Sequence, residues 1–489
     1  MAFLPIISVK ASSDMKKDLF EGFELVEEYK SHSEGFSSKS DANKSKLILA
    51  LGIIVLFVIF AGFVSLNLKP GIAPDEPAHF LFIKEYATTL AKPMDNAATL
   101  ATGWYIKDNP YLYYWFSARI YTIMHWIRPN LSDWQVLQGL RLMSVIYSTL
   151  SLWFLYKSST LLIENKWLQL IPIFLLSNTL MFVFLSGAAN YDPLAILFCF
   201  IAVFFLICAL KLINFWKSTL LFLLMVGLGC LVKYPITPLA FITVISWLIF
   251  SFKLRTQLPK LEIKANLVLL AFVSIILLAN VYLYGRNLIL YKGLTPDCSE
   301  LFIKVQCEIS PYYQRAVAFG LPNKPSLLES IRLGGPTPLA YFFDSWNVLM
   351  LQSIYGILAH IDYEPKHIIS FFQVFYLAIA LLAARFIRKL SGPWGYLLLI
   401  MAFYTVIVFI TNIGSELAFN YSHAAAIQGR YLFPIIGLVY LLTTWVISSI
   451  KNARFKLVVT LLSVVLFLYS GPIKFILNWN GIFNDWFIH

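Results

Sequence analysis

The chain has 489 residues, of which 59% are hydrophobic and only 13% are charged. Soluble domains carry about 25% charged residues, so this composition excludes an ordinary soluble protein and indicates an integral membrane protein. The formal net charge is +12. Lys and Arg gather in short clusters between apolar runs, however, as the positive-inside rule describes for cytoplasmic loops. The charge therefore favours the lipid bilayer, and not nucleic acid, as the partner.

The chain opens with a polar segment rich in Ser, Lys and Glu, which lasts until the first apolar run. Such a segment cannot bury enough apolar surface to fold by itself. We therefore predict a flexible cytoplasmic extension over 1–46, with a short amphipathic helix around 19–29 and no cleavable signal peptide.

Apolar runs of about 20 residues, long enough to cross a membrane, recur over 47–477. With the basic clusters on the cytoplasmic side, the sequence predicts an all-α polytopic membrane protein with about eleven transmembrane helices. Its N-terminus is then cytoplasmic, and the tail 478–489 is external. The expected spans are 47–68, 137–157, 167–187, 193–213, 218–234, 236–252, 265–285, 367–387, 394–412, 431–449 and 457–477.

Two long segments, 69–136 and 286–366, fall outside the cytoplasm in this topology, and we expect helices in both. The apolar stretch 338–360 would break the alternation if it crossed the membrane. Its aromatic content favours an interfacial or re-entrant helix.

Cys298 and Cys307 share the second of these segments, where an oxidising compartment would allow a disulfide. Their spacing, with no histidine nearby, argues against zinc. The remaining cysteines lie in apolar runs and are expected to be inert core residues: Cys199, Cys208 and Cys230.

The motif "PDEPAHF", residues 74–80, follows directly on the first span. Proline suits the first turn of a helix, and an acid at a helix start can cap its free amides. The helix dipole also keeps such a carboxylate ionised, as a general base needs to be to take a proton from a hydroxyl. Capping and catalysis therefore both remain open for Asp75 and Glu76. We favour Asp75 as the base, because Glu76 immediately precedes Pro77 and is the better candidate for the cap.

His79 lies three to four residues after both acids and so shares a helix face with them. It is a candidate for tuning the acids or binding substrate. Asp192, in "NYDP", sits in a very short turn between two spans, where helix capping is the alternative. The turn is too short to leave the external face that also holds the acid pair. These acidic sites could also hold a divalent cation such as Mg²⁺ or Mn²⁺, and the sequence leaves metal dependence open.

Three basic residues oppose the charge bias by falling at external ends of spans: Lys233, Arg430 and, more weakly, Arg141. Each could merely extend to lipid headgroups. Arginine near a membrane also binds phosphate through paired hydrogen bonds. Acids and bases from distant parts of the chain thus map to one face of the membrane, and costly charges at such depth normally mark function. The set suits a substrate that is lipid-embedded and phosphorylated and that reacts with a hydroxyl acceptor.

The motifs "PDEPAHF", "NPYLYYWFSARIY", "NYDPLAI", "VKYP", "QSIYGI" and "GRYLFP" resemble those of an uncharacterised bacterial family of polytopic membrane proteins. That family is similar to the GT-C glycosyltransferase superfold, and in size and topology to serotype-converting glucosyltransferases that decorate O-antigen. The resemblance covers about 47–440.

The resemblance implies a polyprenyl-phosphate sugar donor and an active site on the external face. It also implies a base at Asp75 or Glu76, a second acid at Asp192, and a donor-phosphate site at Arg430 with Lys233 as helper. A single displacement by the acceptor hydroxyl would invert the anomeric centre.

We expect transfer of a hexose such as glucose to a lipid-linked or cell-surface glycan such as O-antigen. The expected location is the periplasmic side of a bacterial inner membrane. A polyprenyl-phosphate sugar synthase and a flippase would act upstream. The alternatives are a transporter or flippase of lipid-linked sugars, and an O-antigen polymerase or ligase.

Overall fold

The computed structural model describes residues 36–320, 326–358, 362–363, 366–390, 392–417, 427–477 and 485–488. The chain divides into two compact units, Met1–Leu51 and Gly52–His489. The boundary falls inside the first described helix, α2 (Phe36–Asn67). The helix expected around 19–29, most of the extension 1–46 and most of the tail 478–489 lie outside the described residues.

Nine helices among the described residues are long and apolar enough to cross a membrane. A bent pair, α7 (Ile171–Ser177) and α8 (Leu180–Ser186), turns by 64° and would make a tenth span. The protein is therefore a multi-pass membrane protein, as predicted. The nine are built on α2, α9 (Asp192–Leu210), α10 (Phe215–Val232), α11 (Thr237–Lys253), α12 (Ile263–Asn280), α20 (Lys366–Phe386), α21 (Trp394–Leu417), α22 (Phe433–Ser449) and α23 (Ala453–Leu468).

Helices lie along all of the predicted spans, but fewer than the predicted eleven are long and apolar enough to cross a membrane: nine among the described residues, or ten if the bent pair over 167–187 counts as one span. The span expected over 137–157 differs in character. It forms α6 (Asp133–Leu162), which is not among the nine apolar helices. The reason is its polar side, which buries Arg141 and a row of serines inside the protein: Ser144, Ser148, Ser151, Ser158 and Ser159.

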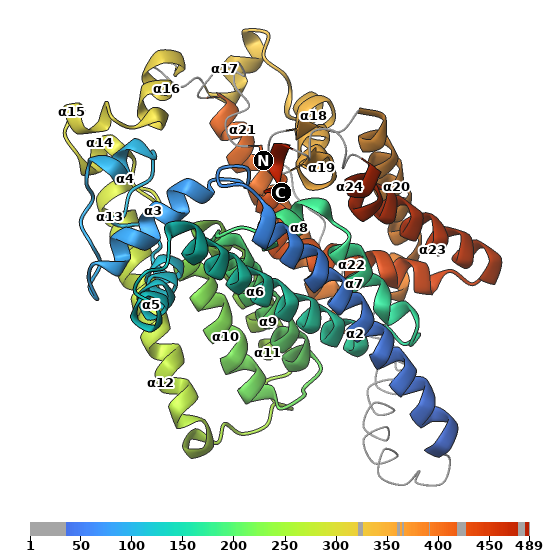
Figure 1. The fold of residues 1–489 in the computed structure, drawn as a ribbon. Coiled ribbons are helices and arrows are strands. Elements are labelled where there is room, and N and C mark those ends of the chain that lie inside the picture. Colours follow the sequence, from blue (N-terminus) through green and yellow to red (C-terminus); the bar gives the residue numbers. More distant parts are fainter. Residues whose placement is uncertain are drawn as a thin grey trace. The chain divides into compact units, whose positions relative to one another are not determined.

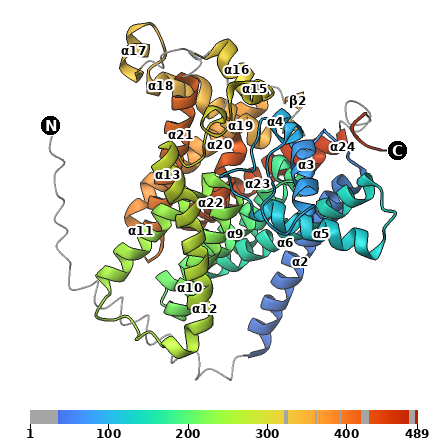
Figure 2. The same cartoon turned by 90° about the vertical axis from the view of Figure 1, so that its left-hand side faces the viewer.

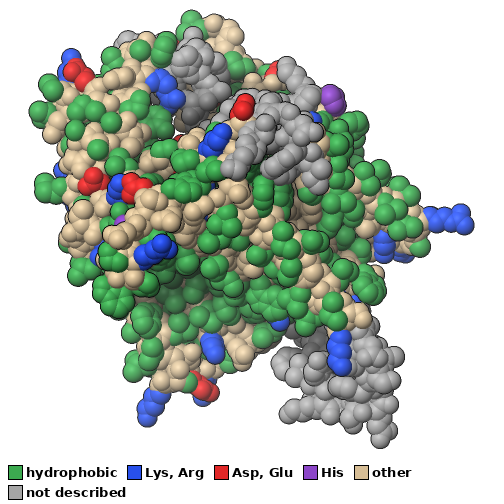
Figure 3. Space-filling model, in the orientation of Figure 1, with side chains coloured by type: hydrophobic (Ala, Val, Ile, Leu, Met, Phe, Trp, Pro, Cys, Tyr) green, Lys and Arg blue, Asp and Glu red, His purple; other side chains and the backbone are tan. Residues whose placement is uncertain are grey.

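The buried and lipid-facing helices can be told apart by their side chains. α9 is apolar all round and is buried over most of its length, as expected of a helix enclosed by others. α12, α20 and α23 instead expose large apolar side chains, including Leu278, Leu381 and Leu462. Figure 3 shows such hydrophobic side chains over much of the face that it draws.

The first loop (69–136) and the second loop (286–366) are largely helical, as expected. The first holds α3 (Glu76–Ala87), α4 (Ala97–Ala101) and α5 (Leu112–Ile127). The second begins in α13 (Arg286–Tyr291), joined to α12 by a π-helical turn, η3 (Val281–Gly285). It continues with α14 (Cys298–Leu301), α15 (Lys304–Cys307), α16 (Pro311–Phe319), α17 (Leu327–Arg332), α18 (Pro338–Tyr341), a π-helical turn η4 (Phe342–Trp346), α19 (Asn347–Tyr355) and the short antiparallel strands β1 (Ile357–Leu358) and β2 (Asp362–Tyr363).

The two loops lie at the same end of the helix bundle. Figure 1 and Figure 2 agree that α4 and α14 to α18 are at one end, and that the connection 254–262 between α11 and α12 is at the other. That connection carries part of a basic cluster, including Arg255 and Lys260. The stretch 338–360, expected as an interfacial or re-entrant helix, forms α18, η4 and α19, and none of these is among the nine apolar helices.

A disulfide between Cys298 and Cys307 closes the start of the second loop. This segment is fastened to the first loop, since the hydroxyls of Tyr105 and Ser310 lie 3.2 Å apart. Tyr312 also covers Gly103, whose φ of +82° and lack of a side chain permit this approach, because a Cβ there would lie 2.2 Å from the Tyr312 ring. The three other cysteines are free and buried.

We predict that reduction of the disulfide loosens this segment of the second loop. Closing so short a loop stabilises the folded segment by roughly 2–3 kcal/mol in the chain-entropy model. Amide hydrogen exchange of peptides from α14 to α16 should therefore accelerate after reduction, or in a Cys298→Ser, Cys307→Ser variant. Peptides from α9 serve as the control. Equal exchange in the oxidised and reduced protein would contradict the prediction.

Candidate active site

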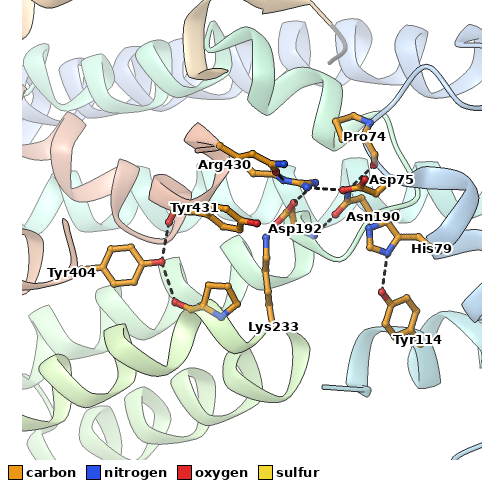
Figure 4. Close-up of polar contacts among 12 residues, drawn as sticks. Pro74, Asp75, His79, Tyr114, Asn190, Asp192, Lys233, Tyr404, Arg430 and Tyr431 are labelled. Atoms are coloured by element: carbon orange, nitrogen blue, oxygen red, sulfur yellow. Dashed lines mark hydrogen bonds and ion pairs between the residues drawn. The ribbon is translucent and has the colours of Figure 1, made fainter. Parts of the chain in front are cut away.

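Four segments that are far apart in the sequence end at one place. They are the start of α3, the turn before α9, the link between α10 and the 3-10 turn η2 (Tyr234–Ile236), and the 3-10 turn η6 (Gly429–Leu432) before α22. Figure 4 shows the charged side chains that they bring together, which we call the charged cluster: Asp75, Asp192, Lys233 and Arg430.

Arg430 lies between the two carboxylates of the cluster. Its Nη2 donates to Asp75 Oδ2 at 2.6 Å, and its Nε donates to Gln428 Oε1 at 2.5 Å. Its Nη1 is 3.7 Å from Asp192 Oδ2, close enough for an ion pair but too far for a hydrogen bond. The Asp75 side chain is 24% exposed, whereas the Asp192 and Arg430 side chains are buried. Asp75 is therefore the more accessible of the two acids.

Asp192 is bound directly by the ammonium group of Lys233. Its backbone amide donates to Asn190 Oδ1 at 2.8 Å, and Asn190 Nδ2 donates to the carbonyl of Pro74 at 3.1 Å. The turn before α9 is thus tied to the residue before Asp75. Asp192 also begins α9, where the helix dipole stabilises a carboxylate.

Two aromatic rings flank the ammonium group of Lys233. Its Nζ lies 4.6 Å from the centroid of the Tyr191 ring and 5.2 Å from that of Tyr431. Both distances allow a cation–π interaction. The expectation that Lys233 merely extends to lipid headgroups does not fit, because its side chain is buried against Asp192 and these rings.

Glu76 and Arg141 form a separate, fully buried ion pair beside the cluster. Arg141 donates through Nε to Glu76 Oε1 at 2.7 Å and through Nη2 to Oε2 at 2.5 Å. Its Nη1 donates to the carbonyls of Ser65, at 3.2 Å, and Leu68, at 2.5 Å, while the amide of Ala189 donates to Glu76 Oε1 at 2.9 Å.

This pair corrects two expectations. Glu76 is not a helix cap, because its carboxylate is turned to Arg141 and not to the free amides of α3. Arg141 is not placed to bind a donor phosphate, because its guanidinium is buried and engaged with Glu76 and two carbonyls. Of the two adjacent acids, Asp75 alone faces the charged cluster and so remains the candidate base.

Asp75 occupies the cap position of α3 without acting as a cap. Its φ of 57° places it in the left-handed region, and its side chain makes no cap hydrogen bond. This conformation is uncommon outside glycine, and strained residues of this kind cluster at functional sites. The observation argues against simple capping at Asp75.

His79 is buried next to the cluster among aromatic rings. Its Nδ1 lies 3.0 Å from the hydroxyl of Tyr114, and the rings of Trp104 and Tyr191 lie 4.7 and 4.5 Å away. Burial away from water lowers the pKa of His79 to about 3, an effect that Asp75 opposes and Arg430 adds to. The ring is therefore neutral near pH 7. Its Nε2 is buried and has no hydrogen-bond partner among the described residues.

The donor set does not fit a divalent cation. Asp75 and Asp192 are both turned toward Arg430, and Asp192 also binds Lys233. Within the described residues, no three His, Cys, Asp or Glu side chains gather as metal ligands.

The residues that hold the charges in place were not predicted from the sequence. A tyrosine adjoins each of Asp192, Lys233 and Arg430 in the chain, and this repeated pairing was a signal that could have been used. Gly429 is needed because a Cβ there would lie 2.6 Å from the carbonyl of Met350 in α19. The amide of Gly429 also donates to Ser353 Oγ at 2.5 Å, so α19 positions Arg430.

Residues 107–279 match the family model described as "Dolichyl-phosphate-mannose-protein mannosyltransferase". The matched region includes Arg141, Asp192 and Lys233, whereas Asp75 and Arg430 lie outside it. No curated protein sequence matches the chain.

Several solved structures are similar to the chain at low identity. The oligosaccharyltransferase of Archaeoglobus fulgidus in the apo form is 15% identical with a TM-score of 0.46, over 88% of this chain and 57% of that one. The same organism's AglB, in complex with an inhibitory peptide and a dolichol-phosphate, is 12% identical with a TM-score of 0.46, over 87% and 55%. ArnT from Cupriavidus metallidurans bound to undecaprenyl phosphate is 12% identical with a TM-score of 0.39, over 84% and 62%. The chain thus spans less than two thirds of the length of each of these proteins.

We predict that the two adjacent acids differ in what they stabilise. Glu76→Gln leaves the Arg141 charge buried without a counter-charge, which typically costs about 3–5 kcal/mol of folding free energy. Asp75→Asn acts at a partly exposed carboxylate and should cost far less. Thermal unfolding of the two variants in the same detergent checks this, and equal destabilisation would overturn the assignment.

We also predict a pH dependence of stability that comes from His79. An unfolded chain binds a proton at this histidine below pH 6.5, whereas the folded protein does so only near pH 3. The free energy of unfolding therefore falls as the pH drops from 6.5 toward 3. His79 contributes up to about 1.4 kcal/mol of this loss for each pH unit. Melting curves of the wild type and His79→Gln between pH 7.5 and 5 should diverge on the acid side; parallel curves would contradict the prediction.

Proposed function

We propose that this protein is a GT-C-type membrane glycosyltransferase that moves a sugar from a polyprenyl-phosphate donor to a hydroxyl group. The observation that carries the proposal is the hydrogen bond between Asp75 and Arg430, formed beside the Asp192–Lys233 pair at the ends of membrane helices. A base and phosphate-binding cations thus share one site. The match of residues 107–279 to a family whose description names a dolichyl-phosphate sugar supports the same class of donor.

Asp75, Arg430 and Lys233 can together catalyse a single displacement at the anomeric carbon. Asp75 takes the proton of the acceptor hydroxyl as its oxygen bonds to the anomeric carbon. The bond from that carbon to the phosphate oxygen breaks, and its electron pair leaves with the polyprenyl phosphate. Arg430 and Lys233 stabilise the negative charge that develops there. One displacement of this kind inverts the anomeric centre.

Arg430 has one nitrogen whose hydrogen-bonding capacity is left for a phosphate when the donor enters the site. Its Nη1 is buried and has no hydrogen-bond acceptor among the described residues. A phosphate oxygen can therefore bind this nitrogen while Nη2 still holds Asp75. The cluster already contains two carboxylates and two cations, so the proton that Asp75 takes up would offset the charge gained by the leaving phosphate.

A cavity of about 200 Å³, which we call the membrane-side cavity, lies between α11 and α21 next to this site. Pro235, Pro238, Ile407 and Val408 line it, and it reaches Tyr431, the residue after Arg430. Apolar side chains on the outer faces of both helices are exposed, as expected next to lipid tails. This arrangement supports a lipid-linked donor.

The identity of the sugar and of the acceptor, the side of the membrane and the upstream enzymes are also part of the proposal. The sugar would be a hexose such as glucose, and the acceptor a lipid-linked or cell-surface glycan such as O-antigen. The site would face the periplasm of a bacterial inner membrane, with the N-terminus cytoplasmic. The basic connection at the end opposite the loops supports this orientation. A polyprenyl-phosphate sugar synthase and a flippase would supply the donor.

The test supplies purified protein with radiolabelled polyprenyl-phosphate glucose and a lipid-linked glycan, and measures label in the glycan. We expect Asp75→Asn to lower the rate about a hundredfold or more, as loss of a general base does. Arg430→Gln should also lower it, since the leaving group loses its main cation. The matched control is Asp133→Asn, at an exposed acid that pairs with Lys84 on the surface.

Full transfer by Asp75→Asn would defeat the site assignment. Movement of the donor across vesicles without transfer would indicate a flippase instead. Transfer of whole glycan blocks would indicate a polymerase or ligase.

A further inference from the structure

A second cavity, also of about 200 Å³, adjoins the charged cluster on the side of the two loops. Aromatic residues make up nearly half of its lining, and we call it the aromatic cavity; it is lined by Trp104, Tyr105, Tyr114, Tyr191, Lys233 and Tyr234, among others. Thr295 and Pro296 of the second loop complete its rim. It is therefore built mainly from loop residues, whereas the membrane-side cavity is built mainly from membrane helices.

The aromatic cavity borders the charged cluster through Lys233. Lys233 is in its wall and binds Asp192, and Tyr191 is the residue before Asp192. The rings of Trp104 and Tyr191 are nearly parallel, with an interplanar angle of 25° and centroids 6.0 Å apart. Both rings contact His79, whose buried Nε2 lacks a partner among the described residues.

The two cavities meet at one residue. Tyr234 lines both of them, and Lys233 lies between the Tyr191 ring of the aromatic cavity and the Tyr431 ring of the membrane-side cavity. A molecule in each would thus approach the charged cluster from a different side. On the proposed function, the donor and the glycan acceptor would reach the cluster by these separate routes.

We propose that the aromatic cavity is the acceptor subsite and holds one pyranose ring of a glycan. The proposal rests on the glycosyltransferase function proposed above and adds where the acceptor binds and what it is. The CH face of a pyranose is apolar and suits the electron-rich face of an aromatic ring. Its hydroxyls can meet the few polar groups of the cavity, such as Asn109 and Thr295. The volume is below the roughly 300–1,000 Å³ of pockets for drug-sized ligands, which suits a single ring better than a peptide.

Two variants test the cavity itself. Trp104→Ala removes a wall, and Thr295→Trp fills the rim without removing any aromatic contact. Trp126→Ala is the matched control, since Trp126 is 82% exposed in α5 and outside the cavity. We expect both cavity variants to raise the KM for the glycan acceptor about tenfold and to leave the KM for the polyprenyl-phosphate donor unchanged, while the control changes neither. A rise in the donor KM instead would place the donor's sugar in the cavity and overturn the proposal.

A binding measurement without donor separates this proposal from the proposed function. Saturation-transfer NMR on the detergent-solubilised protein would use methyl pyranosides of glucose, galactose, mannose, rhamnose and N-acetylglucosamine. We expect at least one of them to bind the wild type and Trp126→Ala, but not Trp104→Ala or Thr295→Trp. Such binding in a protein that transfers no sugar would refute the glycosyltransferase function and keep the sugar site. Absence of binding by all five, or binding unchanged by both cavity variants, would refute the sugar site.

Discussion

The buried ion pair between Glu76 and Arg141 is the interaction on which the site depends. It joins the start of α3 to α6, and through two carbonyls and one amide it also holds the end of α2 and the turn before α9. Buried pairs of this kind are costly to form but far more costly to break, so they fix one arrangement of the segments that meet there. Asp75 immediately precedes Glu76 in the chain, and its position follows from that of Glu76.

Holding Asp75 in this way turns its carboxylate toward the charged cluster. The residue has left-handed backbone angles and no cap bond, so its carboxylate is not bound to the amides of α3 and meets Arg430 instead. Nearby, Arg430 Nη1, Asp192 Oδ2 and His79 Nε2 are buried without hydrogen bonds among the described residues. Arg430 Nη1 and Asp192 Oδ2 face each other at 3.7 Å as an ion pair, whereas His79 Nε2 is a buried polar atom that needs a partner. Stability and function are thus divided between neighbouring acids.

The sequence was enough to predict the membrane class, the positions of the spans and all four members of the charged cluster, because hydropathy and charge bias are strong local signals. The sequence did not show which residue each charged side chain pairs with. Arg141 opposes the charge bias just as Arg430 does, yet one is bound to Glu76 and the other to Asp75. That difference depends on which helix ends meet, and on close approaches such as that of Gly429 to α19, which local sequence does not encode. For the same reason, the serine-lined burial of α6 was not foreseen.

The position of the cluster at the ends of the helices explains why its charges can be both buried and reactive. Deep in the membrane, two carboxylates and two cations would need complete pairing, and a substrate could not displace any of it. In water, the cations would hold a phosphate only weakly, because a high dielectric weakens the Coulomb attraction. At the helix ends, aromatic rings shield Lys233 while Asp75 keeps some exposure. On the proposed function, the cluster would take up one more anion from the lipid side and one more proton from the other, which is the exchange that sugar transfer from a lipid phosphate requires.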